Sequence, residues 1–440
     1  MLLSFRVTNH RSLRDEQQLL LTPEGRQGEE PPAPESVEPL RVAGIFGANA
    51  SGKSNIVDAL RFMVLQVRGY PRRGREEEPA EGIERSPFRL DHDSPGRPST
   101  YVVDLLDDGE RHTYGFVIDD TAVVAEWLFR YTADGREEVV FERDGDELSN
   151  EPEGGLFPVS DVIEIESNVL LMEVFAKLQP KSFDSTEMRS LRAVSRWFTT
   201  GLVIRQRTFG LPRRRVEVPG HCDRITEKRL SKLLVAADTG IEDIQTESFS
   251  REMRDGREQE FVRWVFRHRA SGHEHVLGLE DQSEGTQALM DLGLRAFSVL
   301  DRGRTMVVDE LDASLHTHLS ARLIELFRDP RTNPRGAQLI FTSHDAALLG
   351  RIRGGEVLAR DQIWFSEKSP EGATELYPLS GYEVADEGAR ARKYLAGRYG
   401  AVPFVDDDLF SAALAAREDP IPDDSSAPYR RKAPGRSKGT

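Results

Sequence analysis

The stretch Gly47-Ala48-Asn49-Ala50-Ser51-Gly52-Lys53-Ser54 decides how the rest of the chain is interpreted, because it has the spacing G-x-x-x-x-G-K-[ST]. It follows an apolar run, residues 42–46, and leads into residues 55–67, which have the pattern of a helix. A glycine-rich loop between a strand and a helix lets backbone N–H groups turn towards phosphate oxygens, and the helix adds the positive end of its dipole. The alternative is a glycine turn beside an unrelated lysine, but the strand, loop and helix together favour a site for a nucleoside triphosphate.

Two side chains of this loop are suited to phosphate binding. We expect Lys53 to neutralise the β- and γ-phosphates of a nucleoside triphosphate and the hydroxyl of Ser54 to bind Mg²⁺. The other contacts with the nucleotide are expected from the loop itself and from the first residue of the helix after it. The full predicted nucleotide-binding set is Gly47, Asn49, Ala50, Ser51, Gly52, Lys53, Ser54 and Asn55.

The composition limits the class of protein. A chain of 440 residues is long enough for two or three domains, or for one large α/β core with insertions. Its apolar runs fall short of the roughly 20 residues that cross a bilayer, and the N-terminus has the pattern of a strand, so we expect a cytoplasmic protein without a membrane partner. Cys222 is the only cysteine, which excludes disulfide frameworks, cysteine-rich zinc sites and iron–sulfur clusters.

The charge of the chain limits its contacts with nucleic acid. A net charge of −16 disfavours diffuse binding to DNA, RNA or an anionic membrane, so such contacts would have to be local. The two basic candidates are residues 205–215, which contain five arginines, and residues 430–438 at the C-terminal end. Charge exposed on solvated loops is the alternative interpretation of both, and nucleic acid stays open as a partner.

A second motif lies at residues 305–310, where the apolar run Thr305-Met306-Val307-Val308 ends in Asp309 and Glu310. In phosphate-loop enzymes an Asp at the end of such a strand supports Mg²⁺, and an adjoining Glu is placed to polarise the attacking water. Paired acids are also common at solvated strand ends. After a phosphate loop, however, we interpret Asp309 as a metal-supporting residue and Glu310 as catalytic.

Two further segments are candidates for contact with phosphate. The strand-like residues 338–341 lead into Thr342-Ser343-His344-Asp345, where His344 at the carboxyl edge of a strand can reach a γ-phosphate. Residues 283–287 precede an apolar stripe of helical spacing, and free N–H groups at such a helix start can bind an anion. An ordinary capped helix is the alternative for the second segment.

The remaining pattern suggests five regions. We expect an N-terminal ATPase lobe at 1–67, a loop with an antiparallel β subdomain at 68–150, and a helical insertion at 151–240. A C-terminal ATPase lobe at 241–380 and a C-terminal helix with a disordered tail at 381–440 follow. The predicted fold class is α/β, with a mixed β-sheet flanked by helices.

Taken in order, these motifs resemble those of the ABC/SMC/RecF clade of ATPases. Residues 47–54 look like its Walker A motif, 283–287 its signature, 305–310 its Walker B motif, 311–316 its D-loop and 342–345 its switch histidine. Residues 394–403 resemble a C-terminal motif of a bacterial subgroup of AAA-type ATPases related to the overcoming-lysogenization-defect and abortive-infection proteins. The resemblance covers nearly the whole chain and is weak from residue 68 to residue 272.

The resemblance implies a head-to-tail dimer around ATP and Mg²⁺, with a larger oligomer left open. Lys53 and Ser54 of one subunit would hold the nucleotide, while the signature of the other would cap its γ-phosphate. Asp309 would support the metal, Glu310 would activate water, Asp312 would cross the interface and His344 would sense the γ-phosphate. The signature set is Ser283, Glu284, Gly285, Thr286 and Gln287.

Departures from the clade shape the functional hypothesis. No glutamine is firmly placed as the Q-loop residue, since residues 87–90 lack one and Gln179 is a weak candidate. The long coiled-coil arms and the nuclease domain of single-chain relatives are missing, so the resemblance implies a sensor or scaffold of a two-component phage-defence system with a separate nuclease or toxin. The alternatives are a RecF-like DNA repair ATPase and a low-turnover, ATP-gated switch that binds a protein.

Overall fold

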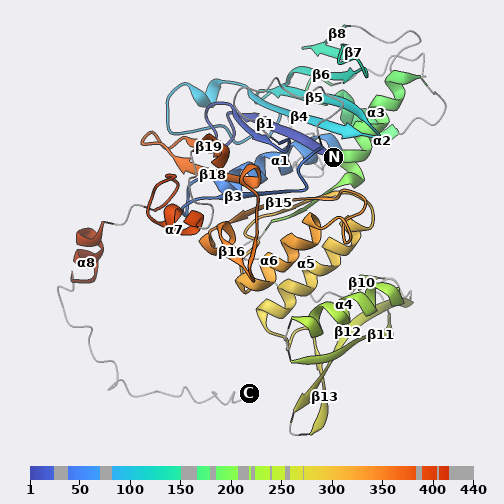
Figure 1. Cartoon of the computed structure of the whole chain (residues 1–440). Helices are drawn as coiled ribbons and strands as arrows, with labels where there is room; N and C mark the ends of the chain where they lie inside the picture. Colours follow the sequence, from blue (N-terminus) through green and yellow to red (C-terminus); the bar gives the residue numbers. More distant parts are fainter. Residues whose placement is uncertain are drawn as a thin grey trace, which may run out of the picture. The chain divides into compact units, whose positions relative to one another are not determined.

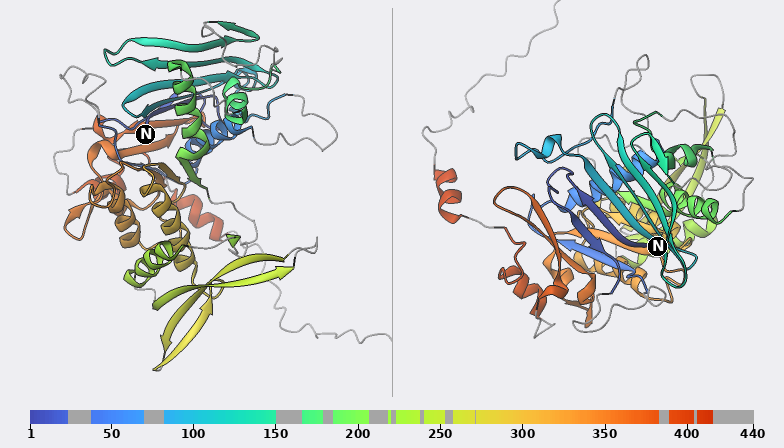
Figure 2. Two further views of the ribbon diagram at one scale, coloured as in Figure 1. Left: turned by 90° about the vertical axis from the view of Figure 1, so that its right-hand side faces the viewer. Right: turned by 90° about the horizontal axis from the view of Figure 1, so that it is seen from above.

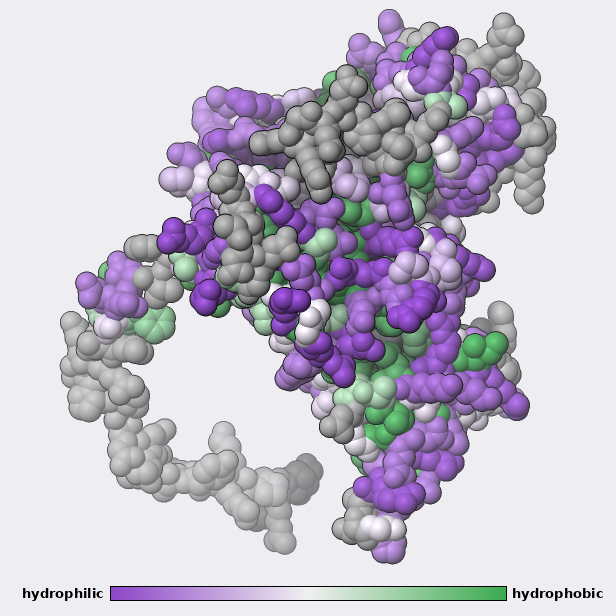
Figure 3. Space-filling model, in the orientation of Figure 1, coloured by the Kyte–Doolittle hydropathy of each residue, from purple (hydrophilic) through white to green (hydrophobic). Residues whose placement is uncertain are grey.

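The computed structural model describes residues 1–23, 38–69, 82–149, 166–178, 185–206, 218–219, 223–237, 240–252, 258–270, 272–382, 389–403 and 406–415. The chain divides into two units, residues 1–402 and 403–440, which are described separately. Among the described residues, no helix is long and apolar enough to cross a membrane. Hydrophilic side chains cover much of the face shown in Figure 3.

A six-stranded sheet lies at the centre of the first unit (Figure 1). Five neighbouring strands run parallel, and only the last edge strand is antiparallel to its neighbour. In spatial order they are β19 (Thr374–Pro378), β18 (Ile363–Lys368), β3 (Val42–Phe46), β15 (Gln338–Ser343), β14 (Thr305–Val308) and β9 (Leu202–Arg205). Because parallel strands carry their carboxyl ends to the same edge, the ends of β3, β14 and β15 meet there.

Both faces of this sheet are covered, which explains why β3 and β14 inside it are almost continuously apolar. Ala43 and Ile45 face a core shared with α1 (Lys53–Arg68) and the N-terminal sheet. Val42 and Phe46, on the opposite face of the same strand, enter a second core with α5 (Glu284–Leu300) and α6 (Thr317–Arg328). The alternation of side chains along β3 therefore divides the protein into two cores, one on each side of the sheet.

The second sheet is antiparallel and has seven strands. Its hairpins were predicted, and the turn between β4 and β5 has left-handed φ angles at Asp108 (50°) and Gly109 (83°), as a tight hairpin requires. In spatial order the strands are β2 (Gln17–Leu20), β1 (Leu2–Thr8), β4 (Ser99–Asp107), β5 (Glu110–Ile118), β6 (Val123–Tyr131), β7 (Glu137–Asp144) and β8 (Glu147–Ser149). Helix α1 lies between this sheet and the central one.

The region predicted as a helical insertion also contributes one strand to the central sheet. Helices α2 (Leu171–Leu178), α3 (Thr186–Arg196) and α4 (Arg224–Ala236) are present, and the turn Trp197–Gly201 is a π-helix. Residues 202–205, however, form β9 and pair with β14 in the central sheet. The predicted helical insertion at 151–240 is corrected in this respect, since three apolar residues followed by Arg205 cannot be assigned to strand or helix by periodicity alone.

A small antiparallel sheet with a helix packed on it follows. Its strands are β10 (Val218–Pro219), β11 (Ile241–Glu252), β12 (Glu258–Ala270) and β13 (His273–Gly278), and Figure 2 shows β11 and β12 as a long twisted hairpin. Helix α4 buries Leu230 and Leu234 in the same core as α5. The expected C-terminal ATPase lobe at 241–380 thus begins with a subdomain that packs against α5, the helix that starts at the predicted signature residues.

The C-terminal part of the first unit packs against β18 and β19 of the central sheet. Helix α7 (Arg390–Leu395) brings Tyr394 against Phe365 of β18, with ring centroids 5.4 Å apart and nearly parallel planes, and Tyr399 stacks on the same ring. Short elements complete the unit: strands β16 (Arg351–Ile352) and β17 (Gly355–Glu356) and the 3₁₀ turns Ser94–Gly96, Ala346–Leu349, Arg360–Gln362 and Leu379–Gly381. In the second unit the described residues include α8 (Asp407–Ala415).

Candidate nucleotide-binding site

The glycine-rich loop connects β3 to α1, as the sequence predicts. Gly52 precedes the helix with a φ of 107°, and Ala50 has a φ of 62°, so the loop passes twice through the left-handed region. A Cβ on Gly47 would lie 2.3 Å from the carbonyl oxygen of Ser366, and one on Gly52 would lie 2.1 Å from Oγ1 of Thr374. Both glycines are therefore required by the hairpin packed behind the loop.

That hairpin, β18 and β19, binds the loop from a position more than 300 residues away in the sequence. Oγ1 of Thr374 donates to the carbonyl oxygen of Ser51 at 2.8 Å, and Oγ of Ser366 donates to the same oxygen at 3.1 Å. Ser12 joins them, because its hydroxyl lies 2.6 Å from Oγ1 of Thr374 and accepts from Nδ2 of Asn55 at 2.6 Å. No local pattern in the sequence predicts this support for the loop.

The turn that carries Ser12 is itself fixed on α1. His10 is buried, with Nδ1 2.8 Å from the hydroxyl of Tyr101 and Nε2 3.1 Å from Oδ2 of Asp58 on α1. Burial alone would raise the pKa of Asp58, but His10 and Arg11 beside it lower that pKa to about 2. The carboxylate therefore stays charged and holds the turn to the helix that begins at the phosphate loop.

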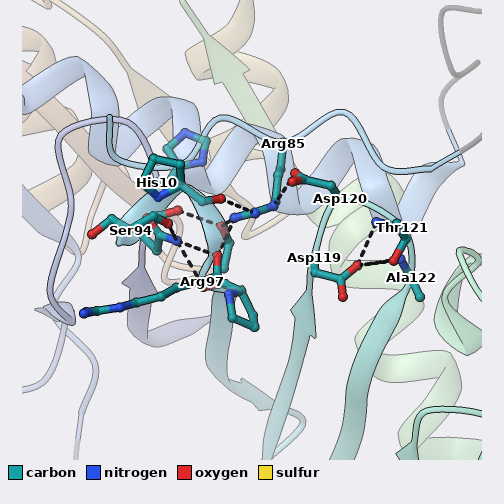
Figure 4. Close-up of polar contacts among 12 residues, drawn as sticks. His10, Arg85, Ser94, Arg97, Asp119, Asp120, Thr121 and Ala122 are labelled. Carbon is teal, nitrogen blue, oxygen red and sulfur yellow. Dashed lines mark hydrogen bonds and ion pairs between the residues drawn. The ribbon is translucent and has the colours of Figure 1, made fainter. Parts of the chain in front are cut away.

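The segment 82–98 supports the same turn from the other side (Figure 4). Arg85 is buried, donating to the carbonyl oxygens of Pro95 and Arg97 and to Oδ1 of Asp120. Nδ2 of Asn9 donates to the carbonyl oxygens of Ser94 and Arg97 at 2.8 Å each. These contacts give the N-terminal turn a fixed position against the start of α1.

Lys53 bridges the loop. Its Nζ donates to the carbonyl oxygens of Gly47 and Ala48, both at 2.8 Å. Burial lowers the pKa of Lys53, and the charges of Asp312, Glu310 and Asp309 oppose that shift, so all three acids lie close enough to act on the ammonium group. The motifs predicted from separate parts of the sequence thus gather at one edge of the sheet.

Ser54 and Asp309 meet across 255 residues of sequence. Oγ of Ser54 donates to Oδ1 of Asp309 at 2.9 Å, and Oγ1 of Thr342 donates to the same oxygen at 2.7 Å. A hydroxyl and a carboxylate are the hard oxygen ligands that Mg²⁺ prefers, and the ion usually completes its shell with substrate phosphates and water. Among the described residues no group of three or more His, Cys, Asp or Glu could hold a metal alone. The donor set therefore fits Mg²⁺ bound together with a nucleotide.

Glu310 has a left-handed backbone, with a φ of 56°, although it is not a glycine. Its N–H donates to Oγ1 of Thr342 at 2.7 Å, and the N–H of Leu311 donates to the carbonyl oxygen of Thr342 at 3.0 Å. Such strained residues cluster at functional sites because the surrounding structure has to hold them in place. The half-buried Glu310 is directly adjacent to the buried Asp309.

Asp312 and His344 form a pair within one chain. Nδ1 of His344 lies 2.8 Å from Oδ2 of Asp312, the Asp312 side chain is 4% exposed and the His344 side chain is 63% exposed. That Asp312 crosses a dimer interface stays a prediction, and within one chain its Oδ2 contacts Nδ1 of His344. Oδ1 of Asp312 is buried without a hydrogen bond. We therefore describe Asp312 as the residue that orients His344.

The predicted signature residues lie at the start of α5. Ser283 precedes the helix, and its Oγ accepts from the N–H of Thr286 at 3.1 Å, while Gln287 donates to the carbonyl oxygen of Gln282 at 2.8 Å. A Cβ on Gly285 would lie 2.8 Å from the carbonyl oxygen of Ser314, so this helix start abuts the turn after Glu310. Ser283 and Glu284 are exposed.

A glutamine that the sequence analysis did not consider for the site, Gln206, follows β9 at the same edge of the sheet. Arg205 ends β9, opposite Val308 in the register, and its carbonyl oxygen accepts from the N–H of Asp309 at 2.9 Å. The next residue, Gln206, therefore follows its strand at the same edge as Asp309 and is half-buried. The signal was a short apolar strand followed by a polar residue.

Several residues named in the sequence analysis lie outside the described residues: Gln179, Cys222, Arg207, residues 213–215 and the basic segment 430–438.

A glycine-rich loop before a helix, beside a parallel strand ending in two acids, defines the class of P-loop nucleotide-binding ATPases. Residues 42–350 match the family described as "AAA domain, putative AbiEii toxin, Type IV TA system", and the chain belongs to this family. The match spans the loop, the acidic strand end and His344.

Solved structures of SMC heads are similar to the chain. One is the SMC head domain from Thermotoga maritima, with 15% identity, a TM-score of 0.38, and coverage of 87% of this chain and 99% of that chain. Another is the Smc head domain with an extended coiled coil bound to the C-terminal domain of ScpA derived from Pyrococcus furiosus, with 13% identity, a TM-score of 0.37, and coverage of 90% and 99%. No curated protein matches the chain.

Proposed function

We propose that this chain binds and hydrolyses ATP and dimerises head to tail around it. The observation that supports this most strongly is the 2.9 Å hydrogen bond between Ser54 of the phosphate loop and Asp309, with Glu310 next in sequence. It joins two motifs from distant parts of the chain, and in phosphoryl-transfer enzymes of this kind a phosphate-loop hydroxyl and such an Asp hold Mg²⁺ together. Release of phosphate from ATP by the purified chain tests this enzymatic activity.

Each residue of the site has a proposed task. Bound Mg²⁺ supplies charge neutralisation at the phosphates, and Ser54 and Asp309 would hold it. Lys53 would exchange its contacts with the carbonyl oxygens of Gly47 and Ala48 for contacts with phosphate oxygens. Glu310 would accept a proton from the attacking water at a carboxylate oxygen.

Two further residues would contact the nucleotide or its surroundings. His344, oriented through Nδ1 by Asp312, would present its other ring nitrogen to the γ-phosphate. Gln206 would contribute from the end of β9, beside Asp309.

The exposed start of α5 supports the dimer. Ser283 and Glu284 face solvent, and free N–H groups at a helix start attract anions, so this tip could cap the γ-phosphate held by a second subunit. ATP would then join the two subunits, and hydrolysis would let them separate. The other three predicted signature residues, Gly285, Thr286 and Gln287, would hold the backbone of this helix start in place.

We further propose a role as the sensor or scaffold of a two-component phage-defence system whose nuclease or toxin is a separate protein. The description of the family, which names a putative AbiEii toxin of a type IV TA system, supports a setting of this kind. The purified chain alone is then expected to leave DNA and RNA intact with ATP present, and a protein encoded beside it is expected to supply cleavage or toxicity. Cleavage by the chain alone, unaffected by mutation of that neighbour, would rule this role out.

A further inference from the structure

Thr342 lies at the centre of the contacts that hold the two acids. It is completely buried in β15, between the strand of the phosphate loop and the strand that ends at the acids. Its Oγ1 donates to Oδ1 of Asp309 and accepts from the N–H of Glu310, each at 2.7 Å. Its carbonyl oxygen accepts from the N–H of Leu311 at 3.0 Å. One residue therefore contacts three consecutive residues of the acidic turn.

The hydroxyl has its orientation fixed by these bonds. A threonine hydroxyl has one hydrogen to donate, and here that hydrogen goes to Asp309. The lone pairs are then directed away from the carboxylate, and one of them receives the N–H of Glu310. Asp309 thus receives two hydroxyls on one oxygen, one from Ser54 of the phosphate loop and one from Thr342.

Glu310 needs such a partner because its φ of 56° is unfavourable for a residue with a Cβ. The N–H bond to Thr342 fixes the residue from one side, and its carbonyl oxygen accepts from the N–H of Ala313 at 3.1 Å on the other. The direction in which the Glu310 side chain leaves the backbone depends on this conformation.

We propose that Thr342 is a positioning residue for hydrolysis, which sets Asp309 and Glu310 relative to the phosphate loop through its hydroxyl. This inference rests on the proposed ATPase activity and adds a residue that does not touch the nucleotide. Its neighbour Ser343 does not share the role, since its Oγ accepts from the N–H of Asp345 at 3.0 Å instead.

Thr342→Val tests the inference, because it keeps the shape of the side chain and removes the hydroxyl. Loss of a residue that orients a ligand-holding carboxylate typically lowers activity by about 10–100-fold, and we expect kcat for ATP to fall by that amount. The Mg²⁺ concentration needed for half-maximal rate should rise, while the affinity for ATP stays unchanged. Thr342→Ser, which keeps the hydroxyl, should restore most of kcat.

Thr113→Val is the matched control. Thr113 is also buried, in β5 of the antiparallel sheet, where its Oγ1 donates to Oδ1 of Asp104, and this variant should keep the wild-type kcat. If Thr342→Val does not fold, Thr342→Ala compared with Thr342→Ser isolates the hydroxyl. A wild-type kcat in the valine or alanine variant, or an equal loss in the serine variant, overturns the positioning role alone. Absence of phosphate release from the wild type overturns the ATPase activity and this inference with it.

Discussion

Lys53→Ala is expected to abolish ATP binding at concentrations where the wild type is saturated. Nζ of Lys53 now bonds two carbonyl oxygens of its own loop, and this ammonium group is the cation of the phosphate loop. Charge-assisted hydrogen bonds contribute about 1.5–3 kcal/mol each, so losing two of them at the phosphates lowers the affinity by on the order of 100-fold or more. Isothermal titration calorimetry with ATP and Mg²⁺ measures the change.

Lys232→Ala is the matched control for the loss of one positive charge. Lys232 is exposed on α4, which packs on β11 and α5 and is remote from the loop in sequence. The affinity of the Lys232→Ala variant for ATP should equal that of the wild type. Retained affinity in Lys53→Ala would show that residues 47–54 do not bind the phosphates.

Glu310→Gln should stop hydrolysis while leaving ATP bound. The amide keeps the size of the side chain and cannot accept the proton of the attacking water, and loss of a general base typically costs about 10²–10⁴ in rate. Because the nucleotide is then not consumed, the variant should accumulate as an ATP-bound dimer. Phosphate release measures the first effect, and light scattering during size-exclusion chromatography with ATP measures the second.

This variant also separates an enzyme from a switch with negligible turnover. A switch would behave the same with Glu or Gln at this position, because it does not depend on hydrolysis. Glu325→Gln, an equivalent change on the exposed face of α6, should leave both measurements at their wild-type values. A Glu310→Gln variant that hydrolyses ATP at the wild-type rate would remove Glu310 from the mechanism.

The parts of the site that could be predicted were those in which chemistry follows local spacing. The phosphate loop and the strand ending in Asp309 and Glu310 are each contained in fewer than ten residues, and their flanking strands are recognisable from short apolar runs. The hairpins of the N-terminal sheet were predictable for the same reason, since turn residues with left-handed preference separate alternating strands.

The parts that could not be predicted depend on contacts between distant segments. Thr374 and Ser12 meet behind the phosphate loop only because β19 and the N-terminal turn are brought together by the fold. The position of Thr342 above the acids depends on the register of β15 against β14, which a single sequence does not determine. Strand β9 was missed because three apolar residues and an arginine are too few to show a period, and the position of Gln206 was missed with it.

We propose that one ATP is held between Lys53 of one subunit and Ser283 of another. Mixing two inactive variants, Lys53→Ala and Ser283→Arg, tests it most directly, because a head-to-tail heterodimer then has one doubly altered site and one intact site. Ser185→Arg controls for loss of a helix cap, since Ser185 is also exposed and its side chain accepts from the N–H of Met188 on α3; this variant should stay active alone. We predict that an equal mixture recovers about a quarter of the wild-type ATPase rate, since half of randomly formed dimers are heterodimers with one working site. A mixture that stays inactive at every ratio, or a Ser283→Arg variant that is fully active alone, would show that ATP is not held between these two residues of neighbouring subunits.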